Sequence, residues 1–192
     1  MSGKALKGLI LFSFVLLSAC SQMTDSLRPH YVGGDMWLRT NLRAVENKVT
    51  WDGYLTGSIL PAGKKVKILE LNDHLVVFLL QGRKYYFHYG RPGSALEARE
   101  LLAKFFEPEP SRALVGLDAR SKALIAIGDV EVGMTKDEVL LSWGYPHRIQ
   151  EEPSINKSDA QIILADRWIY RESAFKEVAL VFSGGRVAKI VK

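Results

Sequence analysis

The single cysteine, Cys20, most constrains how this chain can fold, because the rest of the chain has no partner with which to form a disulfide. It ends a segment with the order of a signal peptide, in which Lys4 and Lys7 precede an apolar run over residues 9–17. That run is too short to span a bilayer, which takes about 20 apolar residues. We therefore predict a signal peptide over residues 1–19, followed by a part that folds on its hydrophobic core alone.

The run Leu17-Ser18-Ala19-Cys20 resembles the lipobox of bacterial lipoproteins. In that family the signal is cut before the cysteine, which then carries acyl chains such as palmitate. The resemblance implies a membrane anchor at Cys20, with each buried CH₂ contributing roughly 0.8 kcal/mol. Ser21 stands where enterobacterial lipoproteins of the inner membrane have aspartate. This implies the outer membrane, on its periplasmic face. The alternative is an ordinary secreted protein with a stray cysteine.

The charge balance does not favour a nucleic-acid partner. The chain has 26 Lys and Arg residues against 21 Asp and Glu, a formal net charge of +5. Without the two lysines of the predicted signal, the net charge is about +3. No run of like charge is longer than a triplet, so no polybasic patch is predicted. Roughly 170 residues remain after the signal, enough for one domain or two small ones.

Residues 20–34 are polar and contain glycine, as expected of a tether, and residues 35–90 have the pattern of short strands. The candidate strands are Trp51–Leu60, Lys65–Leu71, Leu75–Leu80 and Tyr85–Tyr89, separated by turns such as Gln81-Gly82-Arg83-Lys84. They predict a small antiparallel barrel or curled sheet. The segment Ile59–Leu69 resembles the central hairpin of bacterial SH3-like barrels. That resemblance implies an SH3-like segment that could bind peptidoglycan or another glycan.

Composition changes at residues 90–93, a predicted boundary. A linking helix is expected within residues 94–110, with Ser94 and Glu97 as a capping box, ending near Phe106 before two prolines. A second apolar stretch, Leu114–Ile127, could be helical and end at Gly128.

Residues 111–192 contain the most patterned part of the chain. Thr135 and Glu138 form a second capping box, and Gly144 ends the short helix that follows. The predicted strands are His147–Glu152, Gln161–Glu172, Phe175–Phe182 and Val187–Val191, the last two joined by the turn Ser183-Gly184-Gly185-Arg186.

This order resembles the SmpA/OmlA family of small outer-membrane lipoproteins, the BamE type of assembly factor. The matching words are Val132-Gly133-Met134-Thr135, Val139, Gly144-Tyr145-Pro146, Trp168-Ile169-Tyr170, Leu180-Val181-Phe182 and Gly184-Gly185-Arg186-Val187. The resemblance covers about Leu114–Lys192 and implies two helices packed on an antiparallel sheet. The chain departs from that family in its extra β-rich segment and in the helix of residues 94–110. The fold class expected for the whole chain is therefore α+β, with an N-terminal β segment and a separable C-terminal helix-on-sheet domain.

No residue pattern points to catalysis, a metal or a cofactor. None of the four histidines pairs with another at helical spacing, and no serine lies in a nucleophile elbow. His74 and His88 could meet across a hairpin, but they lack a third ligand. We therefore expect no enzyme activity.

Two places are candidate contact sites. On a strand, Tyr86 and His88 share the face opposite Tyr85, Phe87 and Tyr89, and could contact a glycan or a protein. Lys136 and Asp137 lie in the first turn of a helix expected to be exposed. The preferred hypothesis is an envelope lipoprotein that works by protein–protein contact, as a BamE-like assembly or scaffold component. The alternative is a peptidoglycan- or glycan-binding lipoprotein.

Overall fold

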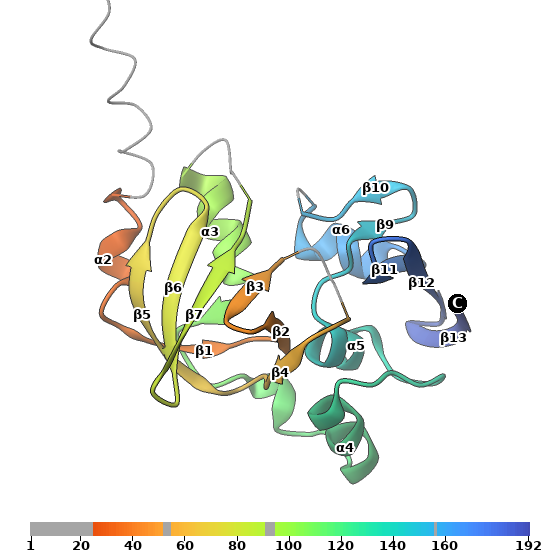
Figure 1. The fold of residues 1–192 in the computed structure, drawn as a ribbon. Coiled ribbons are helices and arrows are strands. Elements are labelled where there is room, and N and C mark those ends of the chain that lie inside the picture. Colours follow the sequence, from red (N-terminus) through yellow and green to blue (C-terminus); the bar gives the residue numbers. More distant parts are fainter. Residues whose placement is uncertain (1–24, 52–54, 91–94, 156) are drawn as a thin grey trace, which may run out of the picture.

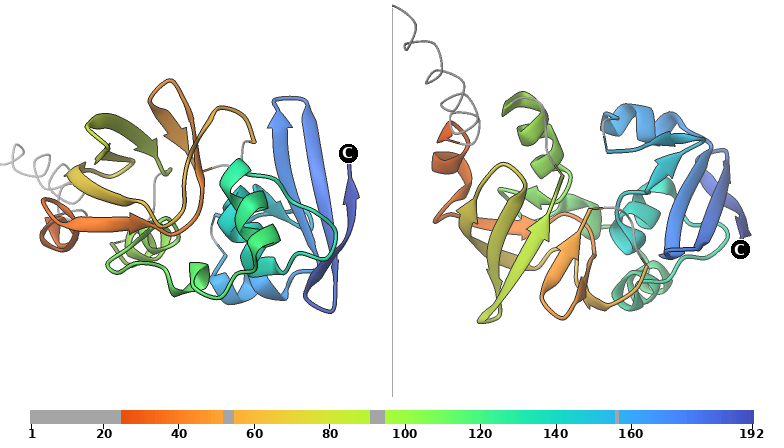
Figure 2. Two further views of the ribbon diagram at one scale, coloured as in Figure 1. Left: turned by 90° about the horizontal axis from the view of Figure 1, so that it is seen from below. Right: turned by 45° about the horizontal axis from the view of Figure 1, so that its top comes forward.

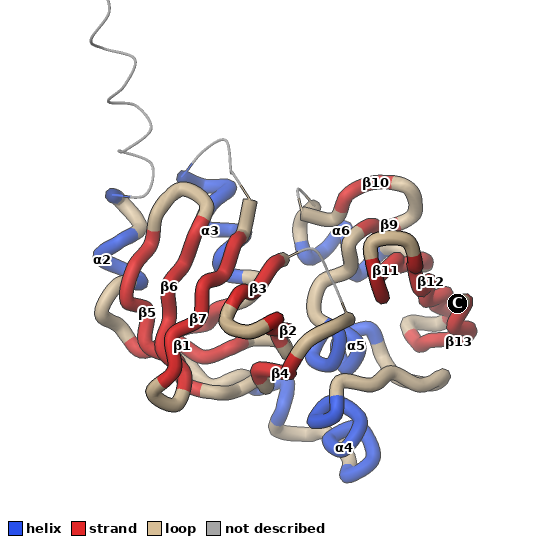
Figure 3. Tube along the Cα trace, in the orientation of Figure 1, coloured by secondary structure: helices blue, strands red, loops and turns tan. Residues whose placement is uncertain are grey.

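The computed structural model describes residues 25–51, 55–90, 95–155 and 157–192, so the predicted signal peptide and Cys20 lie outside the described residues. It has two lobes, each built on its own β-sheet, with five α-helices in the described residues (Figure 1). We call residues 25–110 the first lobe and residues 111–192 the second. Figure 3 shows that strands dominate the first lobe, whereas the second mixes helices and strands. The expectation of a mixed helix and sheet protein is confirmed at this level.

The first lobe is an eight-stranded sheet that curls strongly (Figure 2). Its strands are β1 (Asp35–Leu38), β2 (Leu42–Val45), β3 (Lys48–Thr50), β4 (Ser58–Leu60), β5 (Lys65–Leu71), β6 (Leu75–Leu80), β7 (Arg83–His88) and β8 (Phe106–Glu107). Their order is β4-β2-β3-β7-β6-β5-β1-β8. All neighbours are antiparallel except β3 and β7. The predicted curled sheet is therefore present.

Aromatic side chains form the centre of the first lobe, together with α3 (Ala95–Ala103). Alternate residues of each strand point inward, so Phe78 and Phe87 are fully buried on the inner face of the sheet. The ring centroids of Phe87 and Phe105 lie 4.7 Å apart, and those of Phe78 and Phe106 5.6 Å apart, both pairs edge to face. Such rings stabilise a core through buried area and through their geometry.

The turn at Gln81-Gly82 matches the prediction, but the expected hairpin of Ile59–Leu69 is wrong. Strand β4 pairs only with β2, whereas β5 pairs with β6 and β1. The chain between β4 and β5 is bonded to β1 instead. The Gly63 N–H donates to the Leu38 carbonyl at 2.7 Å, and the Leu38 N–H donates to the Lys64 carbonyl at 2.9 Å. This connection carries the chain across the curled sheet.

Part of the predicted tether is folded. Helix α2 (Arg28–Tyr31) follows Leu27, whose side chain is buried in the core. The Arg28 Nε donates to the Leu71 carbonyl at 3.1 Å, and the Gly33 N–H donates to the Ile68 carbonyl at 2.8 Å. From Leu27 onward, the chain is therefore attached to β5.

The second lobe has a five-stranded antiparallel sheet in the order β10-β9-β11-β12-β13. Its elements are α4 (Ala119–Ile127), α5 (Lys136–Trp143), β9 (Arg148–Ile149), β10 (Glu152–Pro153), α6 (Asp159–Leu164), β11 (Arg167–Ser173), β12 (Lys176–Ser183) and β13 (Arg186–Val191); a short 3₁₀ turn, η1 (Arg112–Leu114), precedes them. The turn between β12 and β13 is where the sequence predicts it, with Gly184 and Gly185 at φ +56° and +76°. These angles suit a two-residue hairpin turn.

Helix α5 starts at the predicted capping box. The Thr135 hydroxyl accepts from the Glu138 N–H at 3.2 Å, and the Glu138 carboxylate accepts from the Thr135 N–H at 2.7 Å. The helix contacts the sheet through rings, because Trp143 and Tyr170 meet edge to face at 5.1 Å. Trp168 is fully buried and donates from Nε1 to the Ile162 carbonyl at 2.9 Å.

Two predicted strands of this lobe are correct only in part. Residues 161–164 of the predicted strand Gln161–Glu172 belong to helix α6, because Ser158 and Gln161 form a capping box, whereas residues 167–172 lie in β11 as predicted. The predicted single strand His147–Glu152 is a short hairpin that contains β9, a tight turn and the first residue of β10. Gln150 has a φ of +52°, so the chain reverses there.

One hydrophobic core extends through both lobes. Asn41, buried at the junction, donates from its amide to the Ile125 carbonyl at 2.6 Å and to the Ser142 carbonyl at 3.1 Å. Its side-chain oxygen accepts from the Ala62 N–H at 2.8 Å. Gly128, with φ +64°, ends α4 close to the first lobe, and a Cβ there would lie 2.6 Å from Arg43 Nη2. The junction is therefore closely packed and fully bonded at Asn41.

Candidate functional site

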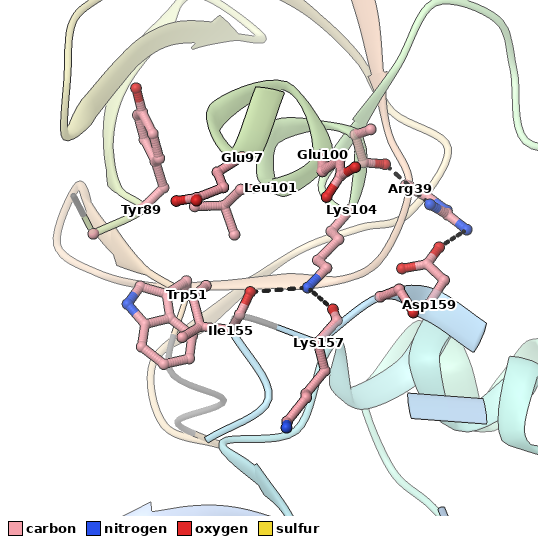
Figure 4. Close-up of a pocket in the computed structure, with 13 residues that line it drawn as sticks. Arg39, Trp51, Tyr89, Glu97, Glu100, Leu101, Lys104, Ile155, Lys157 and Asp159 are labelled. Carbon is pink, nitrogen blue, oxygen red and sulfur yellow. Dashed lines mark hydrogen bonds and ion pairs between the residues drawn. The ribbon is translucent and has the colours of Figure 1, made fainter. Parts of the chain in front are cut away.

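A cleft of about 840 Å³ lies where the two lobes face each other above this junction (Figure 4). The first lobe provides α3 with Lys104 after it, and the residues that directly follow β1, β3 and β7. The second lobe provides the segment that leads into α6. The lining residues are Arg39, Trp51, Tyr89, Gly90, Glu97, Glu100, Leu101, Ala103, Lys104, Ile155, Lys157, Ser158 and Asp159. The volume lies within the range of small-ligand sites and of pockets for a few side chains.

Lys104, at the end of α3, connects the two walls of the cleft. It is 5 % exposed, and its Nζ donates to the carbonyls of Ile155 at 3.1 Å and of Lys157 at 2.7 Å. The same ammonium lies 5.5 Å from the Tyr145 ring centroid. Burial lowers the pKa of Lys104, and the nearby carboxylates of Asp159 and Glu100 oppose that shift. The charge of Lys104 is thus used to hold the main chain of the second lobe.

A second connection joins Arg39 of the first lobe to Asp159 at the start of α6. Their Nη2 and Oδ2 atoms are 2.8 Å apart, and Arg39 also donates to the Ala103 carbonyl at 3.0 Å. The other carboxylate oxygen of Asp159 accepts from the Tyr145 hydroxyl at 3.0 Å. Burial raises the pKa of this tyrosine, so it stays a neutral donor near neutral pH.

The other end of the cleft is apolar and aromatic. Trp51 and Ile155 are half-buried, and Leu101 of α3 is buried. The Trp51 ring stacks on His147 of the second lobe, with centroids 6.1 Å apart. Figure 4 shows the Glu97 carboxylate over Leu101, on the side of Trp51.

The groups that the cleft offers to a ligand are therefore of two kinds. Glu97 and Glu100 are exposed carboxylates on one wall, and Trp51 with Ile155 forms a partly exposed apolar surface. The cations Arg39 and Lys104 are held by groups of the protein itself. This combination is suited to binding an extended chain that carries both polar and apolar groups.

The residues predicted from sequence lie elsewhere. Tyr86 is half-buried and His88 is exposed on the outer face of β7, while Tyr85, Phe87 and Tyr89 are buried. The division of this strand into two faces is therefore as predicted. Cys20 lies outside the described residues.

The expectation that Lys136 is exposed is wrong. The residue is 8 % exposed, and its Nζ donates to the Ile163 carbonyl at 2.6 Å and lies 5.1 Å from the Phe182 ring centroid. Asp166 lies 3.5 Å from the same ammonium. The aliphatic stem of Lys136 packs against the sheet, whereas the neighbouring Asp137 is exposed. Lys136 and Asp137 belong to the second lobe, so the structure does not unite them with Tyr86 and His88.

Sequence reasoning missed the cleft because its residues come from five separate segments. One signal was present, since Lys104 interrupts the apolar run Leu101-Leu102-Ala103-Lys104-Phe105-Phe106. A charged residue in such a run is buried only if it is paired. No comparable signal marks Arg39, Trp51 or Asp159.

Within the residues that the structure describes, three or more His, Cys, Asp or Glu side chains nowhere gather closely enough to hold a metal ion. None of the helices in this part of the chain has the length and apolar character needed to cross a membrane. Comparison with protein-family models, with curated proteins and with solved structures gave no match.

Proposed function

We propose that this chain is a lipid-anchored protein of the cell envelope that works by protein–protein contact, as a BamE-like assembly or scaffold component of the outer membrane. The segment before Cys20 supports the anchor through its basic, apolar and small-residue order. The order of short words across residues 114–192 supports the likeness to the BamE type. Those words include the cap of α5, the Gly144-Tyr145-Pro146 turn and the core residue Trp168.

The observation that carries the contact role is the cleft between the lobes. Both lobes build it, and Lys104 and Arg39 fix its two walls relative to each other. A preformed site of this kind binds without a large ordering cost. We propose that it holds an extended segment of a partner protein, with an apolar side chain on Trp51 and Ile155 and a basic side chain beside Glu97 and Glu100.

Site-specific crosslinking in cells tests this role. A photo-crosslinking residue at Glu100 should capture an envelope protein, whereas one at the exposed Lys122 of α4 should not. Glu97→Gln with Glu100→Gln should weaken the adduct formed from a crosslinker at Ile155, while the double variant keeps its melting temperature. Equal capture from Glu100 and Lys122, or capture that ignores the double substitution, would contradict a partner site in the cleft.

Trp51 favours a second candidate function, the binding of peptidoglycan or another glycan. An indole ring beside exposed carboxylates could stack on a sugar and accept its hydroxyl groups. Under this hypothesis the protein should sediment with isolated peptidoglycan, and Trp51→Ala should release it. Sedimentation that is unchanged by Trp51→Ala would exclude the cleft as a glycan site.

The lipid anchor is tested separately. Cys20→Ser should abolish fatty-acid labelling and leave uncleaved or soluble precursor, because no other thiol is present to accept the acyl chain. Labelling that persists in the serine variant would exclude Cys20 as the attachment site. Fractionation of the wild-type protein with the outer membrane would support the proposed location.

A further inference from the structure

The outer face of the first sheet carries three lysines on neighbouring strands. Lys48 of β3, Lys67 of β5 and Lys84 of β7 are all exposed. Because side chains alternate along a strand, the buried Val49, Ile68 and Tyr85 next to them point to the inner face. Figure 1 shows β5, β6 and β7 in front of α3, and no helix lies over these strands in that view.

The pairing of the strands brings these lysines into one patch. Lys67 is opposite Leu79, and Leu79 is opposite Lys84, so the two lysines lie two strand spacings apart, about 10 Å. Lys48 is opposite Tyr86, which lies two residues after Lys84 and therefore on the same face of β7. We call these five residues, Lys48, Lys67, Leu79, Lys84 and Tyr86, the lysine face.

Carboxylates of the described residues balance only part of the positive charge on the lysine face. None of its three ammonium groups forms an ion pair or hydrogen bond with another described residue. By contrast, Lys65 at the edge of the patch is paired with Asp35 at 2.6 Å. Two carboxylates share this face, because Asp35 of β1 is opposite Lys67 and Glu70 of β5 is opposite Val77, which is itself opposite Tyr86. With Lys65 included, four lysines stand against these two carboxylates, so the face keeps an excess of positive charge. An anionic partner would therefore complement this face.

The apolar residues of the face narrow the kind of partner. Leu79 and Tyr86 are half-buried between the lysines. Tyrosine and lysine together on one surface are typical of protein surfaces at the headgroup level of a bilayer, where the ring and the alkyl stem are partly dehydrated. A soluble polyanion would use the charges but not these apolar groups.

The position of α2, close to the first described residue Asp25, supports the same partner. Helix α2 is attached to β5, one of the strands of the lysine face. Cys20 lies five residues before Asp25, where the description begins, so an extended chain could span at most about 18 Å between them. If Cys20 carries the lipid, the first lobe is held beside the membrane surface.

We propose that the lysine face lies against anionic phospholipid headgroups of the bilayer that holds the lipid anchor, and so orients the tethered protein. This inference rests on the anchor of the proposed function. Three lysines bind an anionic surface only weakly, but a short tether keeps the surface at high effective concentration. The contact therefore sets the orientation of the protein on the membrane, while the lipid anchor recruits the protein there. The cleft stays free for its own partner.

Lysine footprinting on tethered protein tests the proposal. Residues 20–192 would be coupled through Cys20 to a maleimide lipid in vesicles of phosphatidylcholine, with or without about one-third phosphatidylglycerol, and treated briefly with an acetylating reagent. In the anionic vesicles, acetylation of Lys48, Lys67 and Lys84 should slow severalfold. Acetylation of Lys122 and Lys189, exposed in the second lobe, should not change. High salt should remove the protection.

Because the tether is chemical, this result does not depend on natural lipidation, and Cys20→Ser labelling in cells tests the anchor independently. Charge reversal by Lys67→Glu and Lys84→Glu should abolish protection of Lys48, while reversal of Lys122 and Lys189 should leave it unchanged. Equal acetylation in neutral and anionic vesicles would overturn the proposal. Protection that appears only when an acidic envelope protein is added would overturn it in favour of a protein partner.

Discussion

At the scale of single residues, buried polar side chains join the two lobes more specifically than the apolar core does. Asn41 uses both ends of its amide, with three bonds to main-chain groups of other segments. Lys104 and Arg39 do the same at the cleft, and their partners are carbonyls and one carboxylate. Asn41 is the costliest of the three to replace, because its bonds to the Ile125 and Ser142 carbonyls are buried and these carbonyls would be left without a donor.

Replacement of Asn41 should destabilise the whole protein. Asn41→Ala leaves the carbonyls of Ile125 and Ser142 and the Ala62 N–H without their partner, which should cost about 2–4 kcal/mol of unfolding free energy. Urea unfolding followed by circular dichroism would measure it. Asn47→Ala, a half-exposed position in the same lobe, should change stability by no more than about 0.5 kcal/mol. An Asn41 variant that is as stable as this control would refute the bonding role.

Alanine substitutions at Trp168 and at Asp137 should also differ in their effect on stability. Trp168→Ala removes a fully buried ring and its bond to Ile162, and should cost about 3–5 kcal/mol. Asp137→Ala, at an exposed position, should have little effect. Because Lys136 is buried, Lys136→Ala should also destabilise the protein, in contrast to its expected neutrality at the surface. Thermal unfolding of the three variants would check the order, and a neutral Lys136→Ala would contradict the packing described.

At the scale of elements, local sequence signals predicted the helices and strands that begin or end with a cap or a tight turn. The capping box of α5, the stop of α4 at Gly128 and the glycine turn between β12 and β13 all lie where the sequence indicates. Periodicity alone failed at Gln161, where an apolar run suits a strand but the Ser158 cap makes it a helix. Partners distant in sequence, such as β4 with β2, could not be read from local pattern.

The cap of α5 should make stability depend on pH. Burial opposes ionisation of Glu138, but hydrogen bonds from Ser121 and Thr135 outweigh it and lower the pKa of Glu138. A carboxyl whose folded pKa is depressed contributes stability that is present above its unfolded pKa, about 4.3, and is lost as pH falls through the folded pKa. Urea midpoints should therefore fall between pH 6 and pH 3 by less in Glu138→Gln than in wild type. Urea midpoints that fall equally in Glu138→Gln and in wild type would exclude a contribution of Glu138 to the pH dependence.

At the scale of the whole molecule, the cleft exists only because the two lobes share one core. The sequence predicts a separable domain over residues 111–192, but Asn41, Lys104 and the ring pair Phe105–Tyr145 connect the lobes. A cleft whose walls come from both lobes has no counterpart in either lobe alone. For this reason no motif within a single segment indicates it.

We expect the two lobes to unfold in one transition. Wild-type protein should show coincident urea curves for near-UV signals, which report tertiary packing in both lobes, and for far-UV signals. A fragment of residues 111–192 should be less stable than the same residues in the full chain, because Ile125 and Ser142 lose the amide of Asn41. Two separate transitions, or a fragment as stable as the full chain, would instead support the independent domains predicted from sequence.

The bonds of Asn41 also have a consequence for how the protein is made. Its partner carbonyls lie 84 and 101 residues further along the chain. At a synthesis rate of about 5–20 residues per second, the Asn41 amide waits about 5–20 s for the last of them. During that interval Asn41 lacks both partner carbonyls. We therefore expect a newly made chain to bind holding chaperones until its second half arrives.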